Sequence, residues 1–227
     1  QHFMGRGIVP SVDNFGVLGQ PPTHPELLDH LASEFMREDW SVKRLIRRIV
    51  LSSTYRQQSD VRSQNSAAET DTQNVLFNRQ NIKRLEGESL RDAILAVSGR
   101  LDTSMYGPSV PVFLTPFMQG RGRPKDSGPL DGAGRRSIYT AVRRNFLSPM
   151  MVAFDTPAPF TTIGRRNSSN VPAQALILMN DPFVAGEARL WANKTLSDRS
   201  ISATERIRRM YLVAFSREPS DAEKSAA

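Results

Sequence analysis

The fold class can be read from a stretch near the start of the chain, Pro21-Pro22-Thr23-His24-Pro25-Glu26-Leu27-Leu28, where an irregular segment gives way to a helix. Thr23 and Glu26 have the spacing of a capping box, and Pro25 suits the first helical turn because a missing N–H costs nothing there. An apolar stripe at helical spacing follows, formed by Leu27, Leu28, Leu31 and Phe35. The stretch therefore predicts a helix that begins at Thr23.

Helical patterns recur along the rest of the chain. A second helix is predicted after the N-cap Ser41, and the short link 38–40 predicts that it is an antiparallel neighbour of the first. Its buried face is formed by Val42, Leu45, Ile46, Ile49 and Val50. Residues 87–99 predict a helix with an apolar stripe of Leu90, Ala93, Ile94 and Val97, which ends at Gly99. Further helices are predicted at residues 172–179, 182–194 and 203–215, with one turn at 150–154 and a capping box of Ser220 and Glu223.

Two stretches interrupt this pattern. Residues 56–74 are polar and predict a loop, and residues 102–134 are rich in Gly and Pro and predict an irregular insertion. Alternation over residues 138–142 suggests a short strand. We therefore expect a mainly α fold in a single domain over residues 1–227, with five to seven helices, the long Gly/Pro-rich insertion and one or two short strands.

Composition excludes several classes of protein. The chain has 227 residues, of which 39% are hydrophobic, and no apolar run is long enough to span a membrane. Cysteine is absent, so disulfides, thiolate metal sites and cysteine nucleophiles are excluded. Of the three histidines, His24 and His30 are six residues apart and do not share a helix face, so no metal site is expected. No phosphate-loop, dinucleotide or haem-attachment motif occurs, and no cofactor is expected.

The net charge of +7 is concentrated in one region. Residues 121–166 hold nine basic and three acidic side chains, a net charge of +6. Nucleic acid is an unlikely partner, because no recognised motif accompanies the charge and aromatic residues do not alternate with the basic ones. Two possibilities are left for this basic region. Residues 121–125 can form an exposed anion-binding tip, and residues 121–166 can bind an anionic polymer.

Two clusters are candidates for a site. Asp13, His24 and Glu26 can form a carboxylate–imidazole site at a helix N-terminus, or they can serve only as turn and capping residues. The second cluster consists of Arg135, Arg136, Arg143, Arg144 and Asn145. Its arginines can present forked donors to carboxylate, sulfate or phosphate groups, or they can pair with acidic residues and pin the irregular segment. The acidic residues considered for that pairing are Glu88, Asp92 and Asp155.

Several motifs in fixed order carry a resemblance to a known family. They include residues 5–9 (GRGIV), 13–16 (DNFG), 21–29 (PPTHPELLD), 91–99 (RDAILAVSG), 135–139 (RRSIY), 143–145 (RRN), 154–155 (FD) and 172–176 (PAQAL). Together they resemble the planctomycete-type C-terminal domain of unknown function, the PSD family, over roughly residues 5–223. The resemblance implies a large exported protein with cytochrome-c-like domains and an upstream helical domain as partner, in a periplasmic or cell-surface location. It supplies no catalytic residue.

Three functions are consistent with these observations. The first is a non-catalytic structural or interaction module of a longer protein. The second is an extracytoplasmic enzyme acting on polysaccharide, for which Asp13 and Glu26 would be the carboxylate pair. The third is a module that binds polysaccharide or another anionic polymer through residues 121–166.

Overall fold

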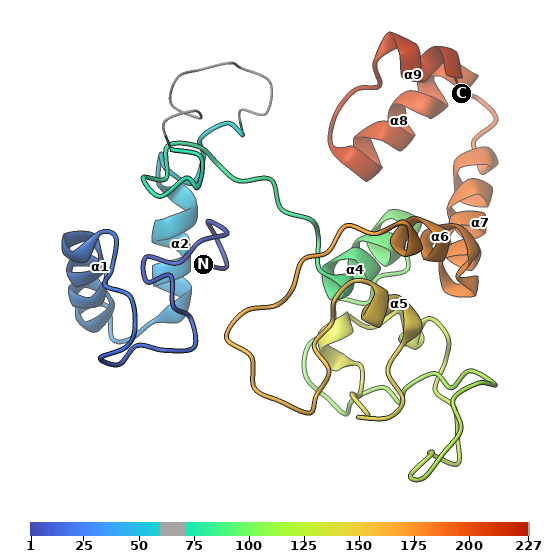
Figure 1. The fold of residues 1–227 in the computed structure, drawn as a ribbon. Helices are drawn as coiled ribbons and strands as arrows, with labels where there is room; N and C mark the ends of the chain where they lie inside the picture. The colour runs from blue at the N-terminus through green and yellow to red at the C-terminus, as the bar shows by residue number, and fades with distance from the viewer. Residues whose placement is uncertain (60–70, 227) are drawn as a thin grey trace. The chain divides into compact units, whose positions relative to one another are not determined.

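The computed structural model of the chain describes residues 1–59 and 71–226 (Figure 1). Its α-helices are α1 (Pro25–Arg37), α2 (Val42–Leu51), α4 (Gly87–Ser98), α5 (Pro149–Ala153), α6 (Pro172–Asn180), α7 (Pro182–Ser197), α8 (Ala203–Phe215) and α9 (Asp221–Ala226). Two 3-10 helices, η1 (Gly132–Gly134) and η2 (Ser137–Tyr139), complete the secondary structure of the described residues, which contain no sheet. The prediction of a mainly helical fold is confirmed. The described residues hold eight α-helices, one more than the upper limit of the predicted five to seven, because the short helices α5 and α9 occur in addition to the six longer ones.

The chain divides into two compact units. Unit 1 comprises Gln1–Arg84 and Ile163–Arg165, and unit 2 comprises Leu85–Thr162 and Arg166–Ala227. The prediction of a single domain stays a prediction. Residues 60–70 of the predicted polar loop lie outside the described residues. No helix in the described part of the chain is long and apolar enough to cross a membrane.

In unit 1, α1 begins at Pro25, two residues after the predicted start at Thr23, and its predicted capping box is wrong. The N-cap is His24, and no side chain caps the helix. Thr23 instead directs both its N–H and its hydroxyl to the carbonyl oxygen of Ile8, at 2.9 and 3.1 Å. The Thr23 side chain therefore anchors the irregular segment before α1 rather than the first turn of the helix.

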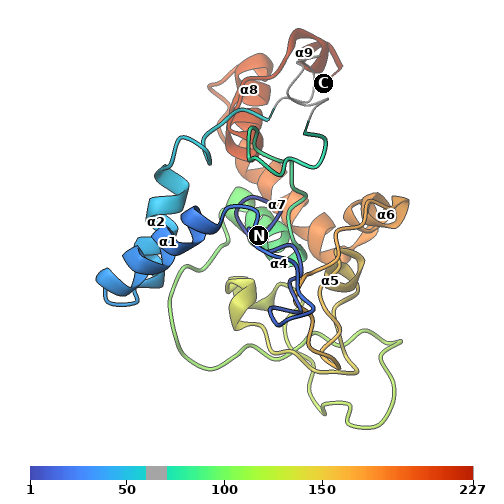
Figure 2. The ribbon, with the colours of Figure 1, turned by 60° about the vertical axis from the view of Figure 1, so that its left-hand side comes forward.

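Helices α1 and α2 are neighbours, as the short link predicted, and lie side by side in Figures 1 and 2. Ser41 caps α2 as predicted and accepts a hydrogen bond from the N–H of Arg44. Glu34 of α1 is buried, and Arg48 of α2 joins it at 2.8 Å and joins Glu38 at 2.6 Å. A buried carboxylate needs such a partner, so this ion-pair group stabilises the contact between the two helices.

The core of unit 2 lies where α4, α5 and α7 meet. Leu95 is completely buried there against Met150, Phe154 and Phe183. The buried positions of α4 are Gly87, Arg91, Leu95 and Ser98, and the predicted stripe of Leu90, Ala93, Ile94 and Val97 is only half-buried beside them. The predicted helix end is confirmed, because Gly99 takes the left-handed conformation at φ 83°.

The predicted strand at residues 138–142 is wrong. Residues 137–139 form η2 instead, and Thr140 makes one isolated parallel bridge with Val110. The alternating side chains do not lie on the two faces of a strand, because Ile138 and Val142 are exposed whereas Tyr139 and Thr140 are half-buried. The stretch 103–131 contains turns and bends without a helix, and its interpretation as an insertion stays a prediction.

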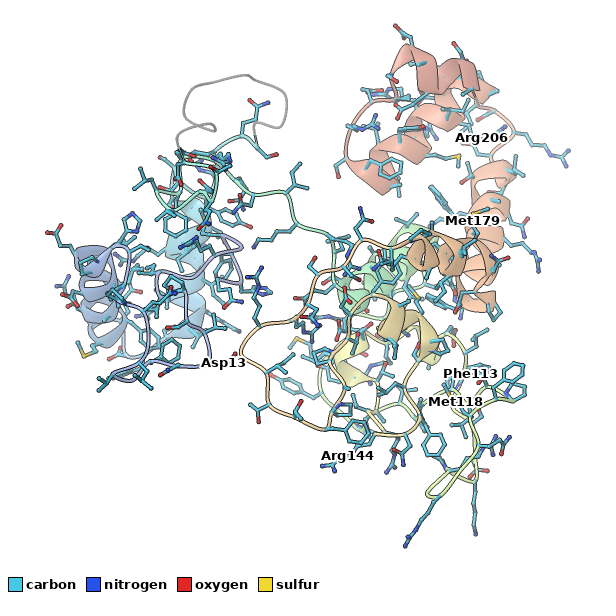
Figure 3. All side chains as sticks on the ribbon, in the orientation of Figure 1. Asp13, Phe113, Met118, Arg144, Met179 and Arg206 are labelled. Atoms are coloured by element: carbon cyan, nitrogen blue, oxygen red, sulfur yellow. The ribbon has the colours of Figure 1, made fainter. Side chains whose placement is uncertain are left out.

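The last two helices are fixed by local contacts. Arg206 of α8, labelled in Figure 3, donates hydrogen bonds to the carbonyl oxygens of Thr195, in the last turn of α7, and of Asp198, which follows α7. The predicted capping box before α9 is confirmed: the N–H of Ser220 donates to Glu223 at 2.8 Å, and the N–H of Glu223 donates to the Ser220 hydroxyl at 3.3 Å. Both nitrogens of the Arg217 guanidinium also bind the Glu223 carboxylate, at 2.7 and 2.8 Å.

These contacts predict an acid-sensitive turn before α9. The hydrogen bond from Arg217, aided by the N–H of Ser220, lowers the pKa of Glu223 from 4.5 to about 2. Because the folded pKa is depressed, the stabilisation is complete above pH 4.5 and is lost as the pH falls towards 2. NMR titration of the Glu223 carboxyl carbon should show the low midpoint, and Arg217→Gln should move it up towards 4.5. The matched change Arg209→Gln should leave it in place, and a midpoint near 4.5 in the unmodified chain would contradict the expectation.

Candidate functional site

The most connected polar group of the described residues is centred on Arg91 of α4, which is 7% exposed. Its Nη1 donates to the carbonyl oxygen of Arg135 at 2.9 Å and to the Ser137 hydroxyl at 3.1 Å, and its Nη2 donates to the carbonyl oxygen of Asp131 at 2.6 Å. The Asp92 carboxylate accepts from the N–H and the hydroxyl of Ser137, both at 2.7 Å. Two consecutive residues of α4 therefore hold residues 131–137 against the helix.

The electrostatics of this group favour a structural role. Burial lowers the pKa of Arg91, and the neighbouring carboxylates of Asp92, Asp131 and Glu187 oppose that shift. The Asp131 carboxylate also binds Arg100, whose other terminal nitrogen lies 3.7 Å from Glu187. The charges of the cluster are thus compensated within the protein, which is what a buried cation requires.

Glycine is required where Arg91 meets this segment. Gly132 has φ +59°, in the left-handed region that side chains rarely adopt. A Cβ on Gly132 would also overlap the Arg91 guanidinium. The absence of a side chain at this position therefore permits both the turn and the close approach of the arginine.

Arg135 has the structural role that was one of its two predicted alternatives. Its guanidinium lies 4.2 Å from the centre of the Tyr139 ring and donates to the carbonyl oxygen of Tyr106 at 2.7 Å. The partners differ from those predicted. Asp92 pairs with Arg91, Glu88 pairs with Arg166 at 2.8 Å, and Asp155 accepts from Ser169.

Four members of the predicted arginine cluster are instead exposed: Arg136, Arg143, Arg144 and Asn145. None of the three arginines forms an ion pair with another described residue. Arg144 is labelled at the surface in Figure 3, and Arg143 lines a small cavity of about 130 Å³ together with Asp126. These side chains are available to a ligand, whereas Arg135 is committed to the fold.

The structure does not combine Asp13, His24 and Glu26 into one site. Asp13, labelled in Figure 3, is exposed and its carboxylate lies against Gly164. The His24 ring packs 5.3 Å from that of Phe77, and its Nδ1 lies 2.9 Å from the Thr23 hydroxyl. Glu26 is exposed in the first turn of α1. None of the three lines a described cavity.

Sequence reasoning missed Arg91 as the central polar residue. The signal lay in helical spacing, because Arg91, Leu95 and Ser98 occupy positions i, i+4 and i+7 of α4 and so share its buried face. An arginine on such a face has to find several acceptors. Among the described residues, no group of three or more His, Asp or Glu side chains is arranged to hold a metal ion.

The comparisons with known proteins identify a family but no activity. Searches of curated proteins and of solved structures gave no significant match. The model of the family PSD1, described as a protein of unknown function (DUF1553), matches residues 1–227. The chain therefore belongs to the PSD1 family, whose function is unknown.

Proposed function

We propose that this chain is a non-catalytic interaction module of a large exported protein that also carries cytochrome-c-like domains. It acts outside the cytoplasm, in the periplasm or at the cell surface, and docks on an upstream helical domain of the same protein. One observation carries this proposal, namely a hydrogen-bonded loop in unit 1 that presents three large apolar side chains to solvent. Phe15, Val17 and Leu18 are 77%, 103% and 91% exposed.

The loop is held in shape by its own hydrogen bonds. The Asn14 side chain accepts from the N–H of Gly16 at 3.0 Å, and the N–H of Gly19 donates to the carbonyl oxygen of Gly16 at 2.8 Å. Ser11 donates its hydroxyl to the carbonyl oxygen of Asn14 at 2.7 Å and accepts from the N–H of Gln20 at 2.9 Å. These bonds shape the backbone of residues 11–20, in which Phe15, Val17 and Leu18 are exposed. Exposed apolar side chains that gather on one surface mark interaction sites.

Photo-crosslinking tests the docking directly. A benzoylphenylalanine at position 15 of the full-length protein should crosslink to its helical domain upstream of this chain, identified by mass spectrometry of the joined peptides. The same amino acid at Phe117, which is 93% exposed in unit 2, is the matched control and should give no such product. Absence of the upstream crosslink at position 15, or equal yields at both positions, would contradict the proposal.

A second measurement separates docking from folding. The triple change Phe15→Ser, Val17→Ser and Leu18→Ser should abolish association with the separately produced upstream domain in calorimetry. It should change the free energy of unfolding of unit 1 by less than about 0.5 kcal/mol, because exposed side chains contribute little to stability. Retained association would count against the proposal.

A second candidate function is binding of an anionic polymer, such as an acidic polysaccharide, by unit 2. Arginines 136, 143 and 144, which are exposed and have no ion-pair partner in the described part of the chain, favour it. Affinity for heparin should fall steeply with salt, and changing all three to Gln should lower the slope of log Kd against log salt by about three. The triple change Lys43→Gln, Arg44→Gln and Arg47→Gln on α2 removes equal charge and should preserve the slope. Salt-independent binding would reject this function.

The polysaccharide-enzyme alternative gains no support from the described residues. It needs two carboxylates facing one cleft about 5 to 10 Å apart. Asp13 and Glu26 do not line a common described cavity. We therefore do not propose a hydrolytic activity.

A further inference from the structure

Unit 1 contains a polar cavity of about 260 Å³ that has two cationic side chains in its wall and no carboxylate. The cations are Arg6 and Arg165, and the amides of Gln20 and Gln73 line the same space. Two like charges at one cavity repel each other unless an anion lies between them. The composition of the wall therefore favours a negatively charged occupant.

Arg6 has a donor that the protein leaves unused. Its Nη1 donates to the Oε1 atom of Gln73 at 2.9 Å, but its Nε is buried and has no hydrogen-bond partner among the described residues. A buried N–H without an acceptor is costly and rare in native proteins. This unused donor shows that the described residues do not fully satisfy the Arg6 guanidinium.

Asp71, a carboxylate that interacts electrostatically with Arg6, is already engaged. Asp71 accepts from the N–H groups of Val75 and Leu76, both at 2.8 Å. These backbone groups are the main reason that the pKa of Asp71 is lowered, and Arg6 contributes least. Asp71 closes its own turn and does not line the cavity.

Arg165 reaches the cavity from a distant part of the sequence. It is exposed and makes no hydrogen bond or ion pair with another described residue. Its neighbour Gly164 lies against the Val12 carbonyl and Asp13, so closely that a Cβ would overlap the Asp13 carboxylate. This contact places residues 163–165 in unit 1 and holds Arg165 beside the segment that carries Arg6.

The backbone around Arg6 is shaped for this placement. Gly5 has φ +78°, and a Cβ on Gly7 would stand 2.8 Å from the carbonyl oxygen of Val9. Both positions therefore favour glycine. The turn directs the one side chain between them, that of Arg6, towards the cavity wall.

We propose that this cavity binds one oxyanion group, a carboxylate, sulfate or phosphate, between Arg6 and Arg165. The forked guanidinium of each arginine matches the geometry of such a group, and the free amide N–H groups of Gln73 and Gln20 supply further donors. A volume of about 260 Å³ corresponds to roughly eight water molecules. That space admits a terminal anionic group with its hydration. The site lies in unit 1, shares Gln20 with the base of the apolar loop, and does not include the exposed arginines of unit 2.

Calorimetric titration with sodium acetate, sulfate and phosphate, at an ionic strength held constant with chloride, tests the site. At least one of the three should bind, and the one that binds most tightly identifies the class of ligand. Arg165→Gln should weaken that binding at least about tenfold, the effect of losing a charge-assisted hydrogen bond. Because Arg165 has no described partner in the protein, this change should not disturb folding. Arg6→Gln should weaken binding as well.

Arg136→Gln is the matched control, because it removes an equal charge from an exposed, unpaired position of unit 2. It should bind the anion like the unmodified chain. No binding of any of the three anions would overturn the proposal. Equal weakening by Arg136→Gln and Arg165→Gln would also overturn it, because that result indicates a general charge effect.

Discussion

Replacing Arg91 by alanine is expected to lower the free energy of unfolding of unit 2 by about 3–5 kcal/mol. The change removes the donor to the carbonyl oxygens of Asp131 and Arg135 and to the Ser137 hydroxyl. It also leaves the Asp92 carboxylate, which is 3.4 Å from Arg91, without its cation. Several buried acceptors lose their partner at once, and each unpaired group carries its own desolvation cost.

The two tryptophans of the chain make this effect measurable unit by unit. Trp40 lies in unit 1 and Trp191 in unit 2, so Trp40→Phe leaves a fluorophore that reports on unit 2 alone. Urea unfolding in that background should show the loss for Arg91→Ala. Arg136→Ala removes an exposed arginine that has no ion-pair partner among the described residues. It should change the free energy of unfolding by less than about 0.5 kcal/mol. Similar effects of the two changes would show that the Arg91 contacts do not stabilise the fold.

Leu95→Ala is expected to destabilise unit 2 by about 2–5 kcal/mol. Leu95 is 0% exposed and packs against Met150, Phe154 and Phe183. The change removes the apolar area of the side chain and leaves a cavity where three helices meet. The cost approaches the upper end of the range if these helices cannot move towards one another and close the cavity.

Leu176→Ala is the matched control, because it makes the same change at a 59% exposed position of α6 in the same unit. It should cost less than about 1 kcal/mol, read from Trp191 in the same urea experiment. The difference between the two leucines measures burial rather than helix propensity. A Leu95→Ala cost no greater than that of Leu176→Ala would contradict the packing of this core.

The sequence alone predicted those features that depend on residues a few positions apart. The first residues of α2, α6, α7 and α8, the Ser41 cap, the Gly99 helix end and the Ser220–Glu223 capping box all follow from local periodicity and hydrogen bonding. Helix propensity and capping operate within one or two turns. These features can therefore be read without knowledge of the tertiary fold.

The predictions that were wrong depended on long-range contacts. Thr23 fits a capping box by spacing, but Ile8, fifteen residues earlier, binds its side chain instead. Residues 138–142 alternate like a strand, but contacts of Ser137 with α4 hold the start of this stretch as a 3-10 turn. A local pattern cannot show which distant acceptor competes for a side chain.

The sequence by itself determined a mainly helical chain of the PSD1 family with a basic region and no cysteine chemistry. The tertiary structure decided which arginine serves which purpose: Arg91 is buried and Arg135 half-buried in the fold, Arg136, Arg143 and Arg144 face solvent, and Arg6 and Arg165 meet at one cavity. All seven have the same side chain and the same charge. What separates them is burial and the set of acceptors within reach. For Arg91, Arg6 and Arg165 both are set by segments 40 or more residues away in the chain.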